Sequence, residues 1–196
     1  MTDVTFYFDV GSPYAYLAAE RVPALLPQPV RWQPVLLGGL FKLTGRSSWA
    51  LGDYRRRQSG MAEIERRARA YGLPPILWPD PWPTDYLGAM RVATYAFEQG
   101  RGREFTHAAM RAAFQHGHEL SISAHVLDAA AQAGLDRSAA SAAMADPRIK
   151  TVLREATDAA HARGVFGVPT VAIGEELFWG DDRLEDAVAQ LRAVAR

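Results

Sequence analysis

Strand patterns stand at the two ends of this chain, and helical patterns fill the long stretch between them. Near the start, residues 4–10 alternate apolar and polar side chains, which is typical of a strand with one buried face. A helical pattern follows to about Leu26, and Val30, Trp32 and Val35 then indicate a second strand. Because a helix separates them, the two strands are expected to be parallel and joined by a right-handed crossover.

Between about Leu40 and Gly164 the sequence predicts helices almost throughout. The expected starts are residues whose side chains accept hydrogen bonds from free backbone N–H groups: Asp53, Asp85, Ser121 or Ser123, and Asp146 before Pro147. The expected ends are glycines, which adopt the left-handed conformation that stops a helix: Gly72, Gly100, Gly117, Gly134 and Gly164. Residues 77–83 contain three prolines and are expected to form a stiff loop.

The strand pattern returns after Gly164. Residues 169–173 and 176–179 flank a short turn, which predicts an antiparallel hairpin. A final helix with apolar residues on one face is expected to begin near Asp181 or Asp182.

The predicted order of elements is βαβ, then helices, then ββα. This order is the thioredoxin topology interrupted in its middle, so the sequence predicts an α/β fold with a mixed sheet and a large all-helical insertion. Residues 1–39 and 165–196 are expected to form a discontinuous thioredoxin-like domain, and residues 40–164 the helical insertion domain.

Composition limits the chemistry that the chain can perform. The 196 residues include no cysteine, which excludes disulfides, thiolate metal sites and cysteine nucleophiles, so any reactive thiol must arrive with a ligand. Lys plus Arg equals Asp plus Glu at 22 each, so no net field attracts nucleic acid or an anionic membrane. The opening MTDVTFYFDV lacks the features of a signal peptide, and no apolar run approaches the ~20 residues that span a bilayer. We therefore expect a cytoplasmic protein.

Gly11-Ser12-Pro13-Tyr14 stands at the junction of the first strand and the first helix. In the simpler interpretation, Ser12 only caps the helix and Pro13 occupies its first position. In the functional interpretation, the helix N-terminus stabilises an anion, and the Ser12 hydroxyl donates a hydrogen bond to the thiolate of a ligand.

Magnitudes decide whether that arrangement is sufficient. Lowering the pKa of a thiol by ~2 requires ~2.7 kcal/mol. A helix terminus supplies ~0.3–2 kcal/mol, and one hydrogen bond to a charged group supplies ~1.5–3 kcal/mol. Together the two effects can hold a thiolate without a protein cysteine.

Two later segments also have a structural and a functional interpretation. Val168-Pro169 is either an ordinary proline entry to an edge strand, or a cis bond that turns the Val168 backbone outward to pair with an extended peptide. Asp181 and Asp182 are each suited to a helix N-cap or first turn. One of these carboxylates is equally suited to bind an ammonium group, such as the α-amine of a γ-glutamyl moiety.

Taken together, four segments point to a known family: FYFDVGSPYAYLA, PVLLGGLFKLTG, YGLPP and GVFGVPTVAIGEELFWGDDRLE. With these segments in order from about Val4 to the C-terminus, the chain resembles the 2-hydroxychromene-2-carboxylate isomerases and kappa-class glutathione transferases, which have a DsbA-like thioredoxin fold. The resemblance implies glutathione as the cofactor, a homodimer, and a place in the degradation of aromatic compounds.

The resemblance also implies a glutathione site made of Ser12, Pro13, Tyr14, Val168, Asp181 and Asp182. In it, Ser12 faces the glutathione sulfur as the catalytic residue, and Val168 pairs with the cysteinyl part through its backbone. Asp181 departs from the family, which usually has Ser or Asn at that position. A second carboxylate there should strengthen ammonium binding but repel the α-carboxylate of the same γ-glutamyl group.

The residues after Gly45 depart from the family as well, because the family commonly has Asn where this chain has Arg46-Ser47-Ser48-Trp49. Arg46 either clamps a substrate carboxylate through a bidentate pair or is a solvated loop arginine. Trp49 and Trp82 lie beside proline-rich turns, and they either wall an aromatic substrate pocket or pack between the domains.

Other polar clusters favour structural roles. His116 and His118 are expected on one helix with their side chains pointing apart, so no metal site is predicted. Six arginines between residues 55 and 69 are interspersed with Glu63 and Glu65, which favours a solvated helix face over a nucleic-acid site.

Three functions stay open from the sequence. The first is a glutathione-dependent isomerase, whose thiolate adds to a 2-hydroxychromene-2-carboxylate-like unsaturated aromatic acid and is then eliminated. The second is a kappa-type glutathione transferase that conjugates an electrophile. The third is a noncatalytic thioredoxin-fold module that binds a peptide or thiol. A disulfide oxidoreductase is excluded, because the chain has no cysteine for the exchange reaction.

Overall fold

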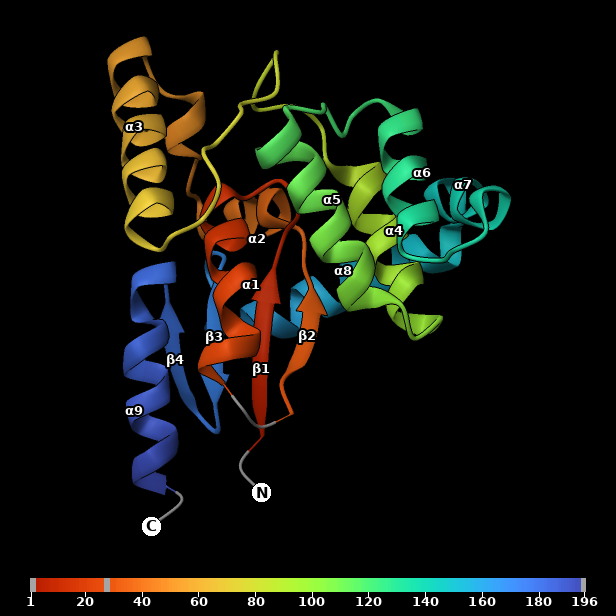
Figure 1. Cartoon of the computed structure of the whole chain (residues 1–196). Helices are drawn as coiled ribbons and strands as arrows, with labels where there is room; N and C mark the ends of the chain where they lie inside the picture. The colour runs from red at the N-terminus through yellow and green to blue at the C-terminus, as the bar shows by residue number, and fades with distance from the viewer. Residues whose placement is uncertain (1–2, 27–28, 195–196) are drawn as a thin grey trace.

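The strand segments from the two ends of the chain meet in one mixed sheet (Figure 1). The computed structural model describes residues 3–26 and 29–194. Within them, the strand order is β2-β1-β3-β4. Strand β1 (Val4–Phe8) is parallel to β2 (Arg31–Pro34) and antiparallel to β3 (Thr170–Ile173), which is antiparallel to β4 (Glu176–Trp179). The thioredoxin-like arrangement predicted from the sequence is confirmed.

Helices account for most of the remaining described residues. In chain order they are α1 (Pro13–Leu25), α2 (Leu37–Thr44), α3 (Tyr54–Ala70), α4 (Leu87–Glu98), α5 (Gly102–His116), α6 (Ser123–Gln132), α7 (Arg137–Ala145), α8 (Pro147–Ala162) and α9 (Leu184–Val194), with short 3₁₀ turns η1 (Trp49–Leu51) and η2 (Asp181–Arg183). The large helical insertion is therefore confirmed as part of the fold.

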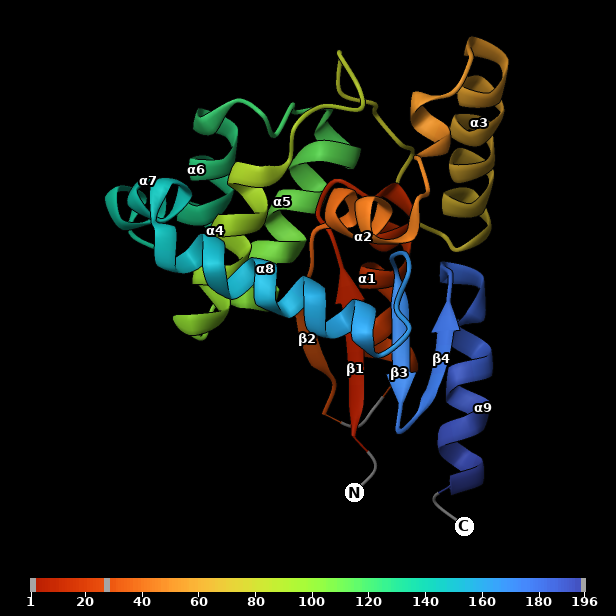
Figure 2. The same ribbon diagram turned by 180° about the vertical axis from the view of Figure 1, so that it is seen from behind.

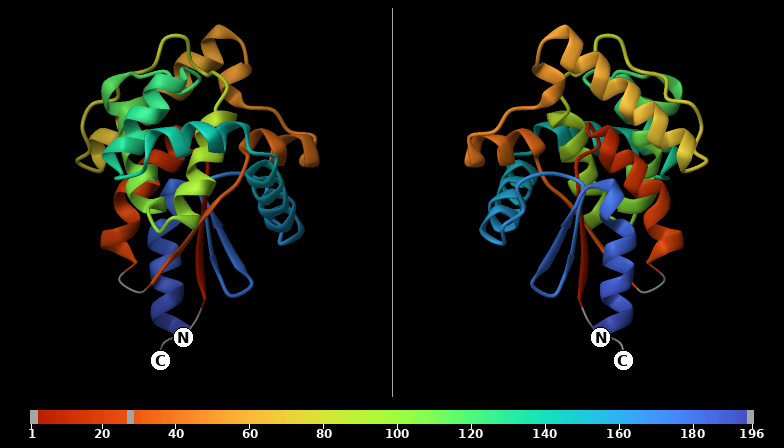
Figure 3. Two further views of the ribbon diagram at one scale, coloured as in Figure 1. Left: turned by 90° about the vertical axis from the view of Figure 1, so that its right-hand side faces the viewer. Right: turned by 90° about the vertical axis from the view of Figure 1, so that its left-hand side faces the viewer.

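Both faces of the sheet are covered, with α1 and α9 on one face and α2 and α8 on the other (Figure 3). Alternate residues of β1 supply the two cores, since successive side chains of a strand point to opposite faces. Val4, Phe6 and Phe8 belong to the larger core, which includes side chains of α1 and α9. Tyr7 belongs to a smaller core with Leu40 of α2.

The remaining helices form a bundle beside the sheet, in which α4 packs on α5, α6, α7 and α8 (Figure 2). Helix α3 lies apart from this bundle and contacts η1 and α1 instead. Helices α2 and α8 of the insertion share the smaller core with the strands, through Leu40 and Ala160. The division into residues 1–39 with 165–196 and residues 40–164 stays a prediction.

Most of the predicted helix ends are found where the sequence placed them. Asp53 and Asp146 cap α3 and α8 through their side chains, and Gly117 ends α5 with a φ of 67°. Two helix starts differ. The N-cap of α6 is Ile122, which has no capping side chain, and not Ser121 or Ser123, and the N-cap of α4 is Tyr86 and not Asp85. The Asp85 carboxylate still accepts a hydrogen bond from the Leu87 backbone N–H at 2.8 Å, so it supports the helix from one residue earlier.

Candidate functional site

Ser12 is the N-cap of α1. Its extended backbone (φ −92°, ψ 115°) lets Oγ accept a hydrogen bond from the Ala15 backbone N–H at 3.2 Å, and Pro13 takes the first helical position. The cap uses the hydroxyl as an acceptor, so its own proton stays available for donation. The Ser12 residue is only 3% exposed. Any ligand that reaches its hydroxyl must first displace the residues that cover it.

Asp9 holds the loop that leads to Ser12. Its carboxylate accepts hydrogen bonds from the Gly11 backbone N–H and the Leu37 backbone N–H, both at 2.9 Å. One side chain thereby fixes both the start of the Ser12 turn and the start of α2. Burial raises the pKa of Asp9 to about 6, although the two backbone N–H groups lower it.

Aromatic side chains enclose the N-terminus of α1. The Tyr86 ring lies directly against Gly11, so that a Cβ added to Gly11 would overlap the ring. On the other side, Trp49 packs edge-on against Tyr14 with ring centroids 6.2 Å apart, and Trp82 packs on Trp49 at 5.5 Å. Trp49 and Trp82 are thus brought together near the Ser12 turn. Trp82 is only 3% exposed and does not line the pocket beside Trp49, so its role as a substrate wall or as interdomain packing stays a prediction.

A pocket of about 510 Å³ lies between this aromatic group and α3. Tyr14 and Trp49 form one side of it, and Arg56, Glu63 and Arg66 line it from α3. Its volume is in the range of ~300–1,000 Å³ that small-molecule sites usually occupy.

The turn before β3 stands at the same end of the sheet as Ser12, because Tyr7 near the end of β1 pairs with Thr170 at the start of β3. The Val168–Pro169 peptide bond is cis. Gly180 N–H donates to the Pro169 carbonyl at 2.9 Å, whereas the Val168 N–H and C=O have no backbone partner in the described part of the chain. Val168 as a whole is only 6% exposed, so a peptide-like ligand can pair with this backbone only after the residues that cover it have moved.

Asp181 is fully buried, at 0% exposed, and its carboxylate already has two protein partners. Arg67 Nη1 contacts one oxygen at 2.8 Å, and the Tyr71 hydroxyl donates to the other at 2.9 Å. Burial raises the pKa of Asp181 more than these two partners lower it. Burial, together with the same hydrogen bond, raises the pKa of Tyr71 to about 12.

Asp182 differs sharply from its neighbour, with 55% of its side chain exposed. It lies 3.2 Å from Arg67 Nη1 and still presents an oxygen to solvent. Of the two carboxylates, only Asp182 is accessible to an ammonium group in this conformation. The ligand role predicted for Asp181 requires that Arg67 and Tyr71 first release it.

Arg46 is exposed and lies apart from the tryptophan pair. Its guanidinium stacks on the Phe166 ring, 4.2 Å from the centroid. Phe166 in turn packs on Trp179, whose indole lies against Gly167. Arg46 therefore borders the Val168 turn and not the pocket beside Trp49.

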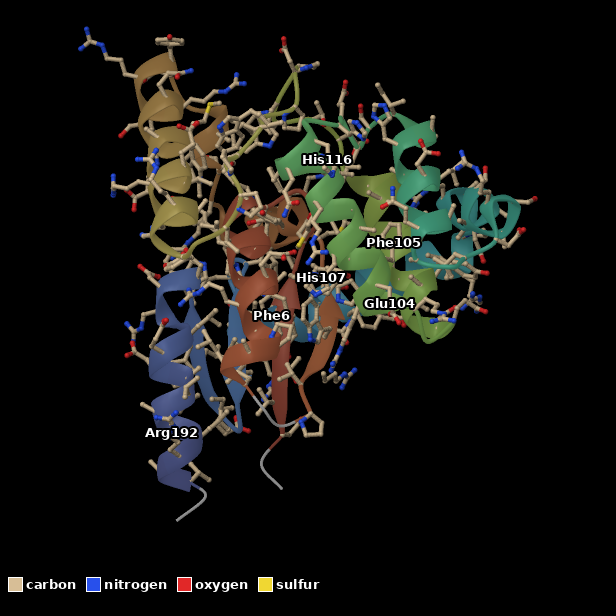
Figure 4. All side chains as sticks on the ribbon, viewed as in Figure 1. Phe6, Glu104, Phe105, His107, His116 and Arg192 are labelled. Carbon is tan, nitrogen blue, oxygen red and sulfur yellow. The ribbon has the colours of Figure 1, made fainter. Side chains whose placement is uncertain are left out.

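The histidines of the helical bundle are arranged differently from the expectation. Helix α5 ends at His116, so His118 lies beyond it, and its ring is 6.0 Å from that of His116 and 4.8 Å from that of His125. Figure 4 shows His107 and His116 along α5. Among residues 3–26 and 29–194, no group of three or more potential ligands is arranged to hold a metal ion.

Sequence reasoning missed the residues that organise this site. Arg67 was grouped with solvated arginines, yet it joins α3 to η2 through Asp181. The available signal was the spacing of four residues between Arg67 and Tyr71, which places both side chains on the same face at the end of α3. For Asp9, the signal was a carboxylate at the end of an apolar strand. Nothing in the pattern distinguished Tyr86, since its contact with Gly11 depends on a loop that returns from a distant segment.

Known proteins resemble this chain along almost its whole length. The family model of the DSBA-like thioredoxin domain matches residues 3–192. This chain belongs to the DSBA-like thioredoxin family. A 2-hydroxychromene-2-carboxylate isomerase of Sphingobium xenophagum is 28% identical over 193 residues, which cover 93% of this DSBA-like chain and 94% of the relative.

Two further relatives of this DSBA-like protein extend the comparison. Glutathione S-transferase kappa 1 of Rattus norvegicus is 26% identical over 200 residues, covering 91% of the chain and 86% of the relative. The solved structure of a selenomethionine 2-hydroxychromene-2-carboxylate isomerase superimposes with a TM-score of 0.85 at 25% identity, covering 98% and 96% of the two chains. The family resemblance stated from the sequence is thus confirmed. None of the helices in the described residues is long and apolar enough to cross a membrane.

Proposed function

We propose that this protein is a glutathione-dependent isomerase of a 2-hydroxychromene-2-carboxylate-like unsaturated aromatic acid. One observation carries the proposal: the capped N-terminus of α1 and the unpaired backbone of Val168 stand at the same end of the sheet. The isomerase relatives align along nearly the whole chain and support the same function.

The residues fit glutathione in three places. Ser12 retains a free O–H donor at a helix terminus that favours an anion. Val168 offers an N–H and a C=O to the peptide part, and the exposed Asp182 carboxylate suits the γ-glutamyl ammonium. Asp181 acts in this arrangement as a positioning residue, because its carboxylate fixes Arg67.

When bound, glutathione would supply a thiolate that adds reversibly to the conjugated acid and permits rotation about a bond that had been double. Ser12 would stabilise the sulfur anion by hydrogen bonding, without itself accepting or losing a proton. The aromatic rings of Trp49 and Tyr14 would exclude water from one side of the α1 terminus. Since Ser12 is nearly buried, the residues that cover it must move for glutathione to enter. The homodimer implied by the resemblance stays a prediction.

The test is the pKa of the bound thiol in Ser12→Ala, read from thiolate absorbance. The variant should raise that pKa and lower turnover of 2-hydroxychromene-2-carboxylate at least tenfold, because a hydrogen bond to an anion is lost. Asp136→Ala is the matched control: it removes the cap of α7, where Asp136 Oδ1 accepts from Ala139 N–H at 2.8 Å. That control should change neither quantity.

Three outcomes would contradict the proposal in different ways. An unchanged thiol pKa in Ser12→Ala refutes the role of Ser12. Consumption of glutathione with an electrophile, without isomerisation, identifies a kappa-type transferase instead. No glutathione binding at millimolar concentration, measured by calorimetry, favours a noncatalytic module.

A further inference from the structure

Four of the five histidines of the chain line one pocket of the helical bundle, between α5 and α6. They are His107, His116, His118 and His125. The pocket has a volume of about 680 Å³, which is within the usual range of small-molecule sites. Its described lining has no residue in common with the pocket beside Trp49, and Figure 4 shows two of the histidines along α5. The proposed isomerase reaction uses none of the four.

The permanent charges around this histidine pocket compensate each other in pairs. Burial raises the pKa of Glu20, but hydrogen bonds from His107 and Arg111 lower it to about 2, so this carboxylate stays ionised near neutral pH. Glu119 is next to His118 in the chain but does not line the pocket. The imidazoles therefore decide whether the pocket carries a net charge. The ion pairs are Arg111 with Glu20, Arg137 with Asp128, and Arg101 with Glu104.

Two of the imidazoles already use the single N–H group of their neutral form. His107 Nδ1 lies 3.1 Å from the Glu20 carboxylate, and His125 Nδ1 lies 2.8 Å from the Glu119 carbonyl oxygen. Both partners can only accept, so in each neutral ring the proton is on Nδ1 and Nε2 has none. Protonation of either ring adds an N–H group at Nε2, which can then donate to a ligand. Ligand binding and proton uptake are therefore coupled in this pocket.

His118 places a third imidazole beside the other two. Its ring stacks on that of His125 with centroids 4.8 Å apart and lies 6.0 Å from that of His116. Imidazole gains its charge between about pH 5 and 8, and protonated rings this close repel each other unless an anion lies beside them. A phosphoryl group suits several such donors, because it carries a charge of about −1.5 to −2 and three acceptor oxygens. A carboxylate offers only two oxygens, in one plane.

Small apolar side chains line the rest of the pocket, with Ala108 and Ala112 from α5 and Ala129 from α6. They leave room for the organic part of a ligand larger than phosphate itself. We propose that this pocket binds a phosphate monoester and takes up a proton as it does so. The phosphoryl group lies at His118 and His125, and the organic part lies over the alanines. This site is separate from the proposed glutathione site, and the inference does not depend on the isomerase function.

Calorimetry at pH 6 and pH 8 tests the site with phenyl phosphate, inorganic phosphate and sulfate as the probes. Sulfate keeps its own charge over this range, so the pH dependence of its binding reports on the protein alone. We expect sulfate to bind at least about fivefold more tightly at pH 6 than at pH 8. Titrations at pH 7 in two buffers of different ionisation enthalpy should show net proton uptake. Phenyl phosphate should bind more tightly than inorganic phosphate, because its ring contacts the alanines.

His118→Gln and His125→Gln each replace an imidazole by a polar side chain that cannot be protonated. Each should reduce the ratio of the sulfate affinities at pH 6 and pH 8 to about twofold or less. His161→Gln is the matched control, because the fifth histidine lies on α8 and does not line the pocket, and it should keep the native ratio. Ala108→Leu fills the floor and should weaken phenyl phosphate more than sulfate. Should His125→Gln not fold, His118→Gln decides the question alone.

Three results would overturn the inference: equal affinity for sulfate at pH 6 and pH 8, a native affinity ratio in His118→Gln, or no binding of phenyl phosphate at millimolar concentration. Equal affinity for inorganic phosphate and phenyl phosphate would overturn the assignment of an ester and identify free phosphate as the ligand. Glutathione is absent from all of these titrations. Loss of the proposed function would therefore leave their results unchanged, and failure of this site would leave the proposed function standing.

Discussion

Replacing Asp9 by Asn should change how the stability of the protein depends on pH. Asp9 is 5% exposed, and its pKa is about 6 in the folded protein against 3.8 as the ordinary value. A carboxyl group whose pKa is raised by folding binds its proton more tightly in the folded state. The free energy of unfolding therefore falls as the pH rises from about 4 through about 6, and becomes level above about pH 7.

The size of this fall follows from the pKa difference. A difference of about 2 in pKa corresponds to about 3 kcal/mol, because each unit is worth ~1.4 kcal/mol. Asn at position 9 cannot titrate, so this contribution is absent in the variant. Asn also loses one of the two hydrogen bonds from Gly11 and Leu37, but that loss is the same at every pH.

Urea unfolding at pH 4, 5, 6 and 7, followed by circular dichroism, measures both proteins over this range. The native protein should lose about 2.4 kcal/mol relative to Asp9→Asn between pH 4 and pH 7, because the carboxyl group of the unfolded chain is already more than half ionised at pH 4. The slope of unfolding free energy against urea should agree between the two proteins, as a check that the unfolded states are comparable. Parallel pH profiles would refute the reasoning, because they would mean that Asp9 titrates alike in the folded and unfolded chains.

Two further predictions concern contacts of the same site. Arg67→Met should lower the free energy of unfolding in urea by about 3 kcal/mol, because it leaves the buried Asp181 carboxylate with Tyr71 as its remaining side-chain partner. An additional Asp181→Asn should recover part of this loss. Strict additivity of the two changes would contradict a direct interaction. Gly11→Ala should lower the melting temperature, at a cost of about 1–3 kcal/mol, because the new Cβ meets the Tyr86 ring. Gly38→Ala is the control, since a Cβ at that position meets no neighbouring atom. Equal melting temperatures for the two variants would show that the Tyr86 ring moves aside freely.

Local patterns were sufficient to predict most of the fold. Alternation along β1 and the caps at Asp53 and Asp146 depend on neighbours a few residues apart, so they can be recognised in the sequence. The start of α4 was misplaced by one residue, because Asp85 supports the helix from outside it. The same types of side chain are suited to neighbouring positions at the start of a helix. Only the backbone conformation shows which of these positions a residue occupies.

The candidate site was predicted less completely than the fold. The position of Ser12 as a helix cap follows from its place before Pro13, and the structure places it there. The hydrogen bonds of the buried Asp181 carboxylate with Arg67 and Tyr71 could not be predicted, because these residues are 114 and 110 positions away from Asp181 along the chain. For the same reason, the contact between Tyr86 and Gly11 has no local signature.

The central strand pair has a consequence for biosynthesis. Val4 pairs with Ile173, so the middle of the sheet is built from nearly opposite ends of the polypeptide. During translation, β1 leaves the ribosome early but has to wait for β3 until almost the whole chain has been made. The helices in between, whose contacts are more local, can assemble meanwhile. A transcript truncated before codon 170 would therefore yield a protein whose first strand has lost one of its two neighbours.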